Sequence, residues 1–172
     1  YLFEGMKKFL SENNKINDDW NALNVLSNNA STVGAYDLDI LDNETIDNVL
    51  SNQFELVFLF GQDNLNIKKK NEFIVYIGTH GDRGAEMADL ILPSAAYTEQ
   101  DGYYTNLEGN LQLAFKASYP PGEAKEDWEI VNEESKKLKG KSLYTNKQEL
   151  IDNLLNYLHQ KSKKNGERVK ND

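Results

Sequence analysis

The feature that most constrains this fold is an apolar run that ends in a glycine-rich turn. Residues 73–77 (FIVYI) are apolar, β-branched and aromatic, as a strand covered on both faces requires. The chain then passes Gly78, Gly81 and Gly84, and glycines this close together favour a backbone with positive φ or close approach to a neighbour. A second apolar run at 56–60 (LVFLF), ended by Gly61, predicts another buried strand.

The segments around these runs predict an α/β fold with a mostly parallel sheet and flanking helices. Residues 85–89 predict a short helix, and residues 90–92 predict a further strand, which Pro93 closes. The connection between 77 and 90 is long enough for a right-handed crossover. The connection at 62–72 is shorter than usual and predicts a tight loop or a single helical turn. Residues 99–110 predict extended segments joined by turns.

Helical periodicity predicts further helices outside this region. They span residues 1–12, 42–52 and 124–139, the last of which ends at Gly140. The segment from Trp20 to Leu26, which Asp18 can cap, predicts another helix. A last helix begins at a capping box of Thr145 and Gln148 and carries Leu150, Leu154, Leu155 and Leu158. We assign residues 1–160 to one α/β domain that is part of a larger domain. Residues 161–172 are charged, lack a core pattern, and predict a disordered or surface tail.

Composition excludes several classes of function. The formal net charge is −9, with 28 acidic against 19 basic residues, which argues against a nucleic-acid partner. Cysteine is absent, so the chain forms no disulfide and ligates no iron–sulfur cluster through thiolates. No apolar run approaches the roughly 20 residues that span a bilayer, so we expect no direct membrane insertion. Tyr1 is not an initiator Met, and we expect a processed chain or part of a longer one.

A long series of short motifs resembles the large iron–sulfur subunit of respiratory complex I, the 75 kDa subunit of NADH:ubiquinone oxidoreductase. The series is Gly78, His80-Gly81-Asp82, Gly84-Ala85, Ala88-Asp89, Ile91-Leu92-Pro93, Ala95-Ala96-Tyr97-Thr98-Glu99, Tyr104, Asn106 and Glu108-Gly109. Upstream, 58–63 (FLFGQD) is similar to that family's Phe-Leu-x-Gly-Ala-Asp, with Gln62 as a departure, and Asn24-Val25-Leu26, Ala30-Ser31 and Asp37-Leu38 match less specifically. Downstream, Pro120-Pro121-Gly122 and Glu126-Asp127-Trp128 form a second anchor. A looser version of the pattern occurs in molybdopterin oxidoreductases, whose fold the C-terminal domain of that subunit resembles.

The resemblance implies a non-catalytic structural role in the peripheral arm of complex I, in support of the module that carries electrons from NADH to quinone. It implies the N-terminal iron–sulfur part of the same subunit and other peripheral-arm subunits as partners. Iron–sulfur clusters and FMN are expected in the rest of the complex, and no cofactor in this chain. The implied location is the matrix side of the mitochondrial inner membrane, or the cytoplasmic side of a bacterial plasma membrane.

The residues themselves favour a structural loop over a catalytic, cofactor or metal site. The loop residues are Gly78, His80, Gly81, Asp82, Gly84, Asn106, Glu108 and Gly109. A glycine loop between strand and helix can cradle phosphate, but the Walker and dinucleotide patterns are absent. His80, Asp82, Glu86 and Asp89 make a poor metal set, because catalytic zinc wants three protein ligands and the only other histidine is His159. Instead, we expect a hydrogen bond from His80 that fixes the loop, a solvated pair of Asp82 with Arg83, and turn roles for Glu99, Asp101 and Glu108.

Two other functions stay open at this point. The chain is alternatively the C-terminal part of an active molybdopterin oxidoreductase, or a free-standing binding module that uses the Gly78–Gly84 loop. The strands at 56–60 and 73–77 are apolar on both faces and need cover that a short connection cannot supply. We therefore expect that residues 1–172 do not behave as an independent domain.

Overall fold

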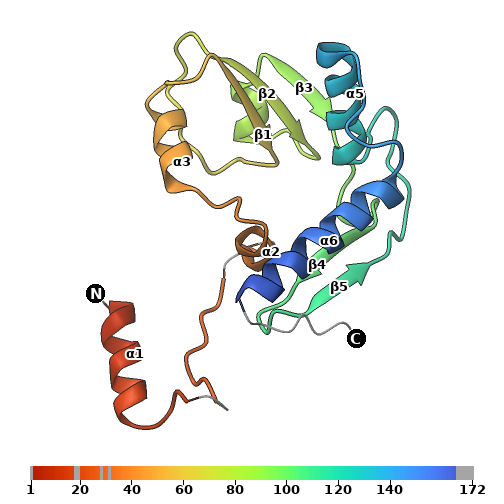
Figure 1. The fold of residues 1–172 in the computed structure, drawn as a ribbon. Coiled ribbons are helices and arrows are strands. Elements are labelled where there is room, and N and C mark those ends of the chain that lie inside the picture. Colours follow the sequence, from red (N-terminus) through yellow and green to blue (C-terminus); the bar gives the residue numbers. More distant parts are fainter. Residues whose placement is uncertain (1, 18–19, 28, 31, 166–172) are drawn as a thin grey trace.

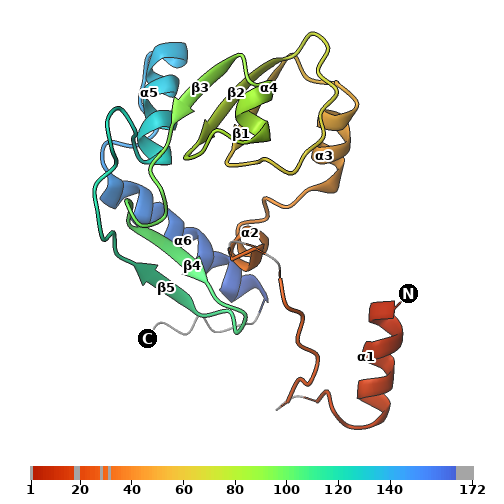
Figure 2. The same ribbon diagram turned by 180° about the vertical axis from the view of Figure 1, so that it is seen from behind.

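The computed structural model describes residues 2–17, 20–27, 29–30 and 32–165. The helices are α1 (Leu2–Glu12), α2 (Thr32–Asp37), α3 (Asn43–Leu50), α4 (Arg83–Met87), α5 (Asp127–Lys139) and α6 (Lys147–Asn165). The strands are β1 (Leu56–Phe60), β2 (Phe73–Gly78), β3 (Leu90–Pro93), β4 (Gly102–Thr105) and β5 (Leu111–Ala114). Figures 1 and 2 show a sheet layer with its helices, a hairpin with α6 beside it, and α1 apart from both.

The central layer is a parallel sheet in the order β1-β2-β3. Val57 pairs with Ile74 between β1 and β2, and Val75 pairs with Leu90 between β2 and β3. The connection from β1 to β2 contains no helix in the structure, whereas α4 connects β2 to β3. The predicted α/β class with a mostly parallel sheet and flanking helices is confirmed.

The two faces of this sheet are covered to different extents. On one face, Val57, Leu59, Ile74 and Tyr76 form a core with Ile67 of the connecting loop, and residues of α3 and α4 pack against it. On the other face, Ile130 of α5 packs on Val75, Ile77 and Leu92, which belong to β2 and β3. Figures 1 and 2 place α5 at the β3 side of the sheet. The central strand β2 is therefore buried on both faces from Ile74 to Ile77, as predicted.

The predicted strand β1 is present, but within this chain it is buried on one face only, which agrees with the expectation that the strand needs cover that the chain itself does not supply. Its residues alternate, so that Val57 and Leu59 are buried while Leu56, Phe58 and Phe60 are exposed. The physical reason is that α5 covers the β2–β3 half of that face and no described element covers the β1 half.

A hairpin of β4 and β5 follows the sheet and confirms the extended segments expected after residue 99. α6 lies alongside it in both views. The end of α6 also joins α2, because the Lys161 ammonium donates to the carbonyl oxygens of Tyr36 and Asp37 and to the Asp39 carboxylate. These contacts satisfy carbonyl groups at the end of α2 that have no partner within the helix.

Several helix predictions need correction. The helix expected between Trp20 and Leu26 is absent from the described part of that segment, and its expected cap, Asp18, lies outside the described residues. The Asn21 side chain accepts the Leu23 N–H instead, a local bond that competes with helix formation. The six-residue helix α2 was not predicted, and α5 begins at Asp127, three residues later than expected.

The predicted capping box of α6 is displaced by one residue. Asn146 accepts the Glu149 N–H, and the Glu149 carboxylate accepts the Thr145 N–H, in place of the Thr145 and Gln148 pair. The helix continues to Asn165, so the first part of the segment 161–172 is helical, and its remainder, 166–172, lies outside the described residues. Among the described residues, no helix combines the length and the apolar character that crossing a bilayer requires.

The carboxyl edge of the parallel sheet as a candidate site

The candidate site lies where β1, β2 and β3 end. In open parallel sheets, ligands bind beyond the carboxyl ends of the strands, because loops from several strands meet there. In this chain the edge carries residues 61–63 after β1, the glycine loop after β2, and Ser94 after β3. What this edge can bind depends on which polar groups of these loops are already hydrogen-bonded within the chain.

The Asp63 carboxylate binds a backbone N–H at the start of α4. One carboxylate oxygen accepts the Gly84 N–H at 2.8 Å, and the other accepts the Tyr76 hydroxyl at 3.1 Å. A free N–H at a helix start is the group that would bind a phosphate, but here a carboxylate holds it. Asp82 adds a second negative charge at the same turn and Arg83 a positive one, and the Gly84 N–H is not free for an anionic ligand.

The Tyr76 ring lies buried at this edge of the sheet. It is 2% exposed. Burial, followed by the hydrogen bond and charge of Asp63 and by the charge of Asp82, raises the pKa of Tyr76 to about 12. The hydroxyl therefore remains a proton donor to Asp63 at neutral pH and does not serve as a base.

Two of the three loop glycines are required by the Tyr76 ring. A Cβ on Gly84 would lie 2.4 Å from the ring and 2.7 Å from the Gln62 carbonyl oxygen, and a Cβ on Gly78 would lie 2.5 Å from the ring. The close approach expected of this loop is confirmed at these positions. The expectation of a special backbone at Gly81 is wrong, because its φ lies outside the left-handed region and a Cβ there would have no neighbour within 4 Å.

The remaining loop residues are exposed. The His80 ring nitrogen Nδ1 lies 2.8 Å from the Thr79 hydroxyl, a local hydrogen bond of the kind expected to fix the loop. Asp82 precedes α4 without a capping bond from its side chain. No ion pair joins Asp82 to Arg83 in the described structure, so the predicted pair is not formed.

Asp89 joins β2 to the start of β3. Its carboxylate accepts the Ile74 N–H at 2.9 Å and pairs with the Lys69 ammonium at 2.6 Å, and its own N–H donates to the Ile74 carbonyl oxygen. The Lys69 hydrogen bond, followed by the Ile74 N–H, lowers the pKa of Asp89. This residue is therefore engaged in holding strands together, away from His80 and Asp82.

At the end of β3, sequence reasoning missed a buried polar junction. The Ser94 hydroxyl donates to Asp127 at the start of α5, and burial raises the pKa of the Asp127 carboxyl despite that bond. The neighbouring Glu126 carboxylate accepts the Trp128 indole N–H at 3.0 Å and pairs with Lys147 of α6. The signal was present as the Glu126-Asp127-Trp128 anchor, but only the fold brings it to Ser94 and Lys147.

A pocket of about 220 Å³ opens beside this junction, between the hairpin and α6. Its walls combine apolar side chains with the charged groups of Asp101, Glu126, Asp127 and Lys147. Lys147 lies between Glu126 and Asp101 and pairs with both, whereas Asp127 bonds to Ser94, so the lining of the pocket carries more acidic than basic groups. The arrangement joins the sheet, the hairpin and α6.

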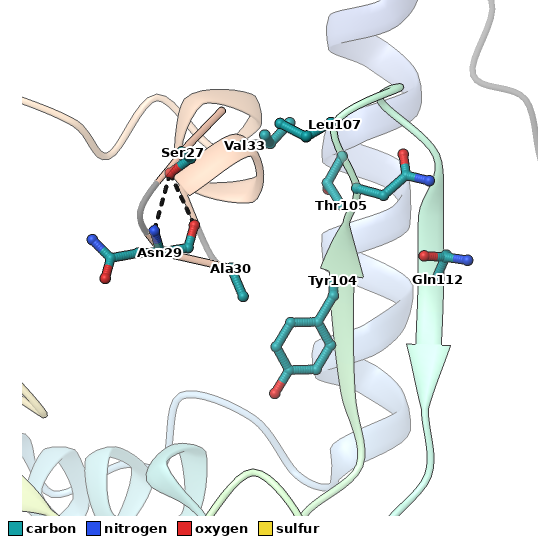
Figure 3. Close-up of a pocket in the computed structure, with 9 residues that line it drawn as sticks. Ser27, Asn29, Ala30, Val33, Tyr104, Thr105, Leu107 and Gln112 are labelled. Atoms are coloured by element: carbon teal, nitrogen blue, oxygen red, sulfur yellow. Dashed lines mark hydrogen bonds between the residues drawn. The ribbon is translucent and has the colours of Figure 1, made fainter. Parts of the chain in front are cut away.

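The second group of predicted loop residues forms the hairpin turn. The Asn106 side-chain oxygen accepts the N–H groups of Glu108 and Asn110, each at 2.9 Å, and Gly109 adopts a φ of 80°. This turn borders a pocket of about 360 Å³ that α2 and the preceding segment close from the other side (Figure 3). Figure 3 shows its lining as hydroxyl, amide and aliphatic side chains, from Ser27 and Val33 to Tyr104 and Gln112.

The structure does not gather the acidic candidates into one centre. Among the described residues, no group of three His, Asp or Glu side chains is placed to hold a metal ion. Glu99 accepts the Ala96 N–H, Asp101 accepts the Lys116 N–H, and Glu108 accepts the Asn110 amide. The carboxylates thus satisfy separate backbone and side-chain donors.

Comparison with known proteins gives a consistent family assignment. The family model described as molybdopterin oxidoreductase matches residues 2–137. The chain is 48% identical over 144 residues to an NADH-quinone oxidoreductase subunit of Rickettsia bellii, which covers 83% of this chain and 21% of that protein. It is 43% identical over 130 residues to the NADH-ubiquinone oxidoreductase 75 kDa subunit of Reclinomonas americana, covering 73% of this chain and 19% of that protein. It is 39% identical over 146 residues to the mitochondrial NADH-ubiquinone oxidoreductase 78 kDa subunit of Candida albicans, covering 83% of this chain and 20% of that protein. The chain therefore spans about a fifth of the length of these relatives.

Proposed function

The chain belongs to the molybdopterin oxidoreductase family, and from this premise we propose that it is a non-catalytic structural part of the large iron–sulfur subunit of a respiratory NADH:quinone oxidoreductase. The observation that carries the proposal is the 48% identity to the NADH-quinone oxidoreductase subunit of Rickettsia bellii, which extends over 83% of this chain. The residues 1–160 then form part of a larger α/β domain of that subunit, to which the end of α6 up to Asn165 also belongs.

The geometry of the sheet edge supports the non-catalytic role. Asp63 holds the Gly84 N–H, and the nearby charges of Asp63 and Asp82 are negative. A molybdopterin cofactor carries phosphate, and the Gly84 N–H, which such a group would use at the helix start, is already bonded to the Asp63 carboxylate. We therefore place no pterin or metal on this loop and derive no catalytic step from it.

The role of such a part is to support the electron-carrying part of the subunit. Iron–sulfur clusters are held by thiolate ligands, and this chain has no cysteine, so we assign the clusters to the rest of the complex. We also expect FMN there. The proposed partners are the iron–sulfur part of the same subunit and other subunits of the peripheral arm. The proposed location is the matrix side of the mitochondrial inner membrane, or the cytoplasmic side of the plasma membrane in a bacterium.

The test is affinity purification of the tagged full-length subunit from detergent-solubilised membranes. We expect other respiratory subunits and FMN to co-purify, with NADH oxidation activity and no stoichiometric molybdenum by elemental analysis. Stoichiometric molybdenum would instead support the alternative of an active molybdopterin oxidoreductase. A lone monomer that binds a phosphate compound would support the free-standing module, which the closed Gly84 N–H disfavours.

A further inference from the structure

We propose that the outer edge of β1 and the bare apolar face beside it receive a further strand–helix unit, supplied by a segment of the same polypeptide outside these 172 residues. The inference rests on the proposed function, because it requires this chain to be part of a longer subunit. It adds the surface of this chain on which the rest of the subunit packs, and the strand and helix by which it packs there.

The first observation is a contiguous patch of large apolar side chains. Leu56, Phe58 and Phe60 of β1 and Phe73 of β2 are 41–49% exposed. The register pairs Leu56 with Phe73, so these side chains lie on one face of adjacent strands. They continue the row formed by Val75 and Ile77, which α5 covers. The face is therefore one apolar surface of which the described structure covers only half.

The second observation is the open edge of β1. Gly61 donates its N–H to the Ile77 carbonyl oxygen, and the Glu55 carbonyl oxygen accepts the Phe73 N–H, so the odd-numbered residues direct their backbone groups toward β2. The N–H groups of Phe58 and Phe60 consequently point away from the sheet. In the part of the chain that the structure describes, no strand pairs with them.

The third observation is that β1 lacks the devices that protect a natural edge strand. Such strands carry lysine, proline, a bulge or a covering loop, because unpaired edges otherwise associate with other chains. The sequence LVFLF contains no charged residue and no proline. Its composition is that of an interior strand of a parallel sheet, which indicates that another strand normally lies beside it.

The fourth observation concerns chain direction. α3 leads into β1 and packs on the same face as α4, the crossover helix between β2 and β3. Right-handed crossovers predict that a strand preceding α3 would lie on the outer side of β1. The segment before α3 comes instead from α2, next to the hairpin, and leaves that position empty in the described structure. A strand from elsewhere in the polypeptide fits this empty position beside β1, and the helix connected to that strand fits the bare apolar face of the sheet.

The occupant follows from the length of the relatives. The chain spans 21% and 19% of two of them, so most of such a subunit lies outside these residues. An apolar, uncharged strand edge suits a permanent intramolecular partner more than an exchangeable one. A second copy of this chain and a different subunit are the competing occupants that the experiment must separate.

The test uses the purified full-length subunit with p-benzoylphenylalanine in place of Phe58, and in place of Phe115 as a control. Phe115 is 77% exposed and lies beyond β5, away from the sheet. After irradiation, mass spectrometry should find a crosslink from position 58 to a segment of the same polypeptide outside residues 1–172, and position 115 should not reach that segment. A crosslink to a second copy or to another subunit, or the absence of a product from position 58, would overturn the proposal.

Residue-resolved hydrogen exchange tests strand pairing separately. In the full-length subunit, the outward amides of Phe58 and Phe60 should exchange far more slowly than in an unstructured peptide. Leu59 is the internal control, because its N–H points to β2 and is protected in either case. Fast exchange at 58 and 60 with slow exchange at 59 would show an open edge and refute the added strand. Both measurements need only the subunit, so they stand apart from the co-purification that tests the proposed function.

Discussion

Replacement of Gly84 by alanine should destabilise the glycine loop, while the same change at Gly81 should not. A Cβ at Gly84 would lie 2.4 Å from the Tyr76 ring and 2.7 Å from the Gln62 carbonyl oxygen, closer than real Cβ contacts. The ring cannot retreat easily, since Tyr76 is 2% exposed and its hydroxyl is bonded to Asp63. The alanine would also tend to displace the Gly84 N–H from Asp63.

The magnitude follows from two opposing effects. Overpacking a well-packed core costs about 1–3 kcal/mol, and removing a helical glycine returns about 0.5–1 kcal/mol. Gly84→Ala should therefore lose about 1–2 kcal/mol of unfolding free energy. In the full-length subunit, whose unfolding entropy is larger, that loss lowers Tm by less than the about 2–4 °C per kcal/mol expected of a domain of roughly 150–250 residues. Gly81→Ala meets no neighbour within 4 Å and should be neutral or slightly stabilising.

The assay is thermal unfolding of the full-length subunit, followed by intrinsic fluorescence, with the yield of assembled complex on a native gel as a second readout. Equal shifts for the two alanine variants would refute this prediction, because only a Cβ at Gly84 meets the Tyr76 ring and the Gln62 carbonyl oxygen. Normal stability of Gly84→Ala with a loss of NADH oxidation would instead indicate a catalytic loop.

Three further predictions concern the site and the chain as a whole. His80→Ala should leave NADH oxidation by the assembled complex largely intact, because His80 bonds only to Thr79 among the described residues; a loss of about a hundredfold, or about 2.7 kcal/mol of barrier, would contradict this. Burial raises the pKa of Asp127, so its contribution to stability is greatest at low pH and falls as pH rises from the ordinary carboxyl pKa of 3.8 through the raised pKa of the folded state. Asp127→Asn should remove that dependence when unfolding is measured as a function of pH, and an unchanged profile would argue against it. Residues 1–172 expressed alone should aggregate or bind a hydrophobic dye, because each bare β1 side chain is about half exposed and forgoes roughly half of the about 1.5–3 kcal/mol that full burial contributes. A sharp reversible transition of a monodisperse monomer would disprove this.

Local sequence pattern is sufficient to specify part of this fold. The run at 73–77 is apolar without interruption, and β2 is the strand buried on both faces. Asp42 caps α3, and Gly140 ends α5 with a φ of 72°. Such elements follow from side-chain periodicity and from bonds between residues a few positions apart, so no distant contact is needed to specify them.

Tertiary packing selects which of several equivalent residues carry the site. Gly78, Gly81 and Gly84 look alike in sequence, but the Tyr76 ring reaches two of them and leaves Gly81 free. The closure of the loop by Asp63 joins residues 21 positions apart, and the bond from Ser94 to Asp127 joins residues 33 positions apart. The apolar composition of β1 predicts a strand buried on both faces, whereas its exposure in the structure depends on which helices reach it. These features depend on packing between residues far apart in the sequence, and the pattern of neighbouring residues does not specify that packing.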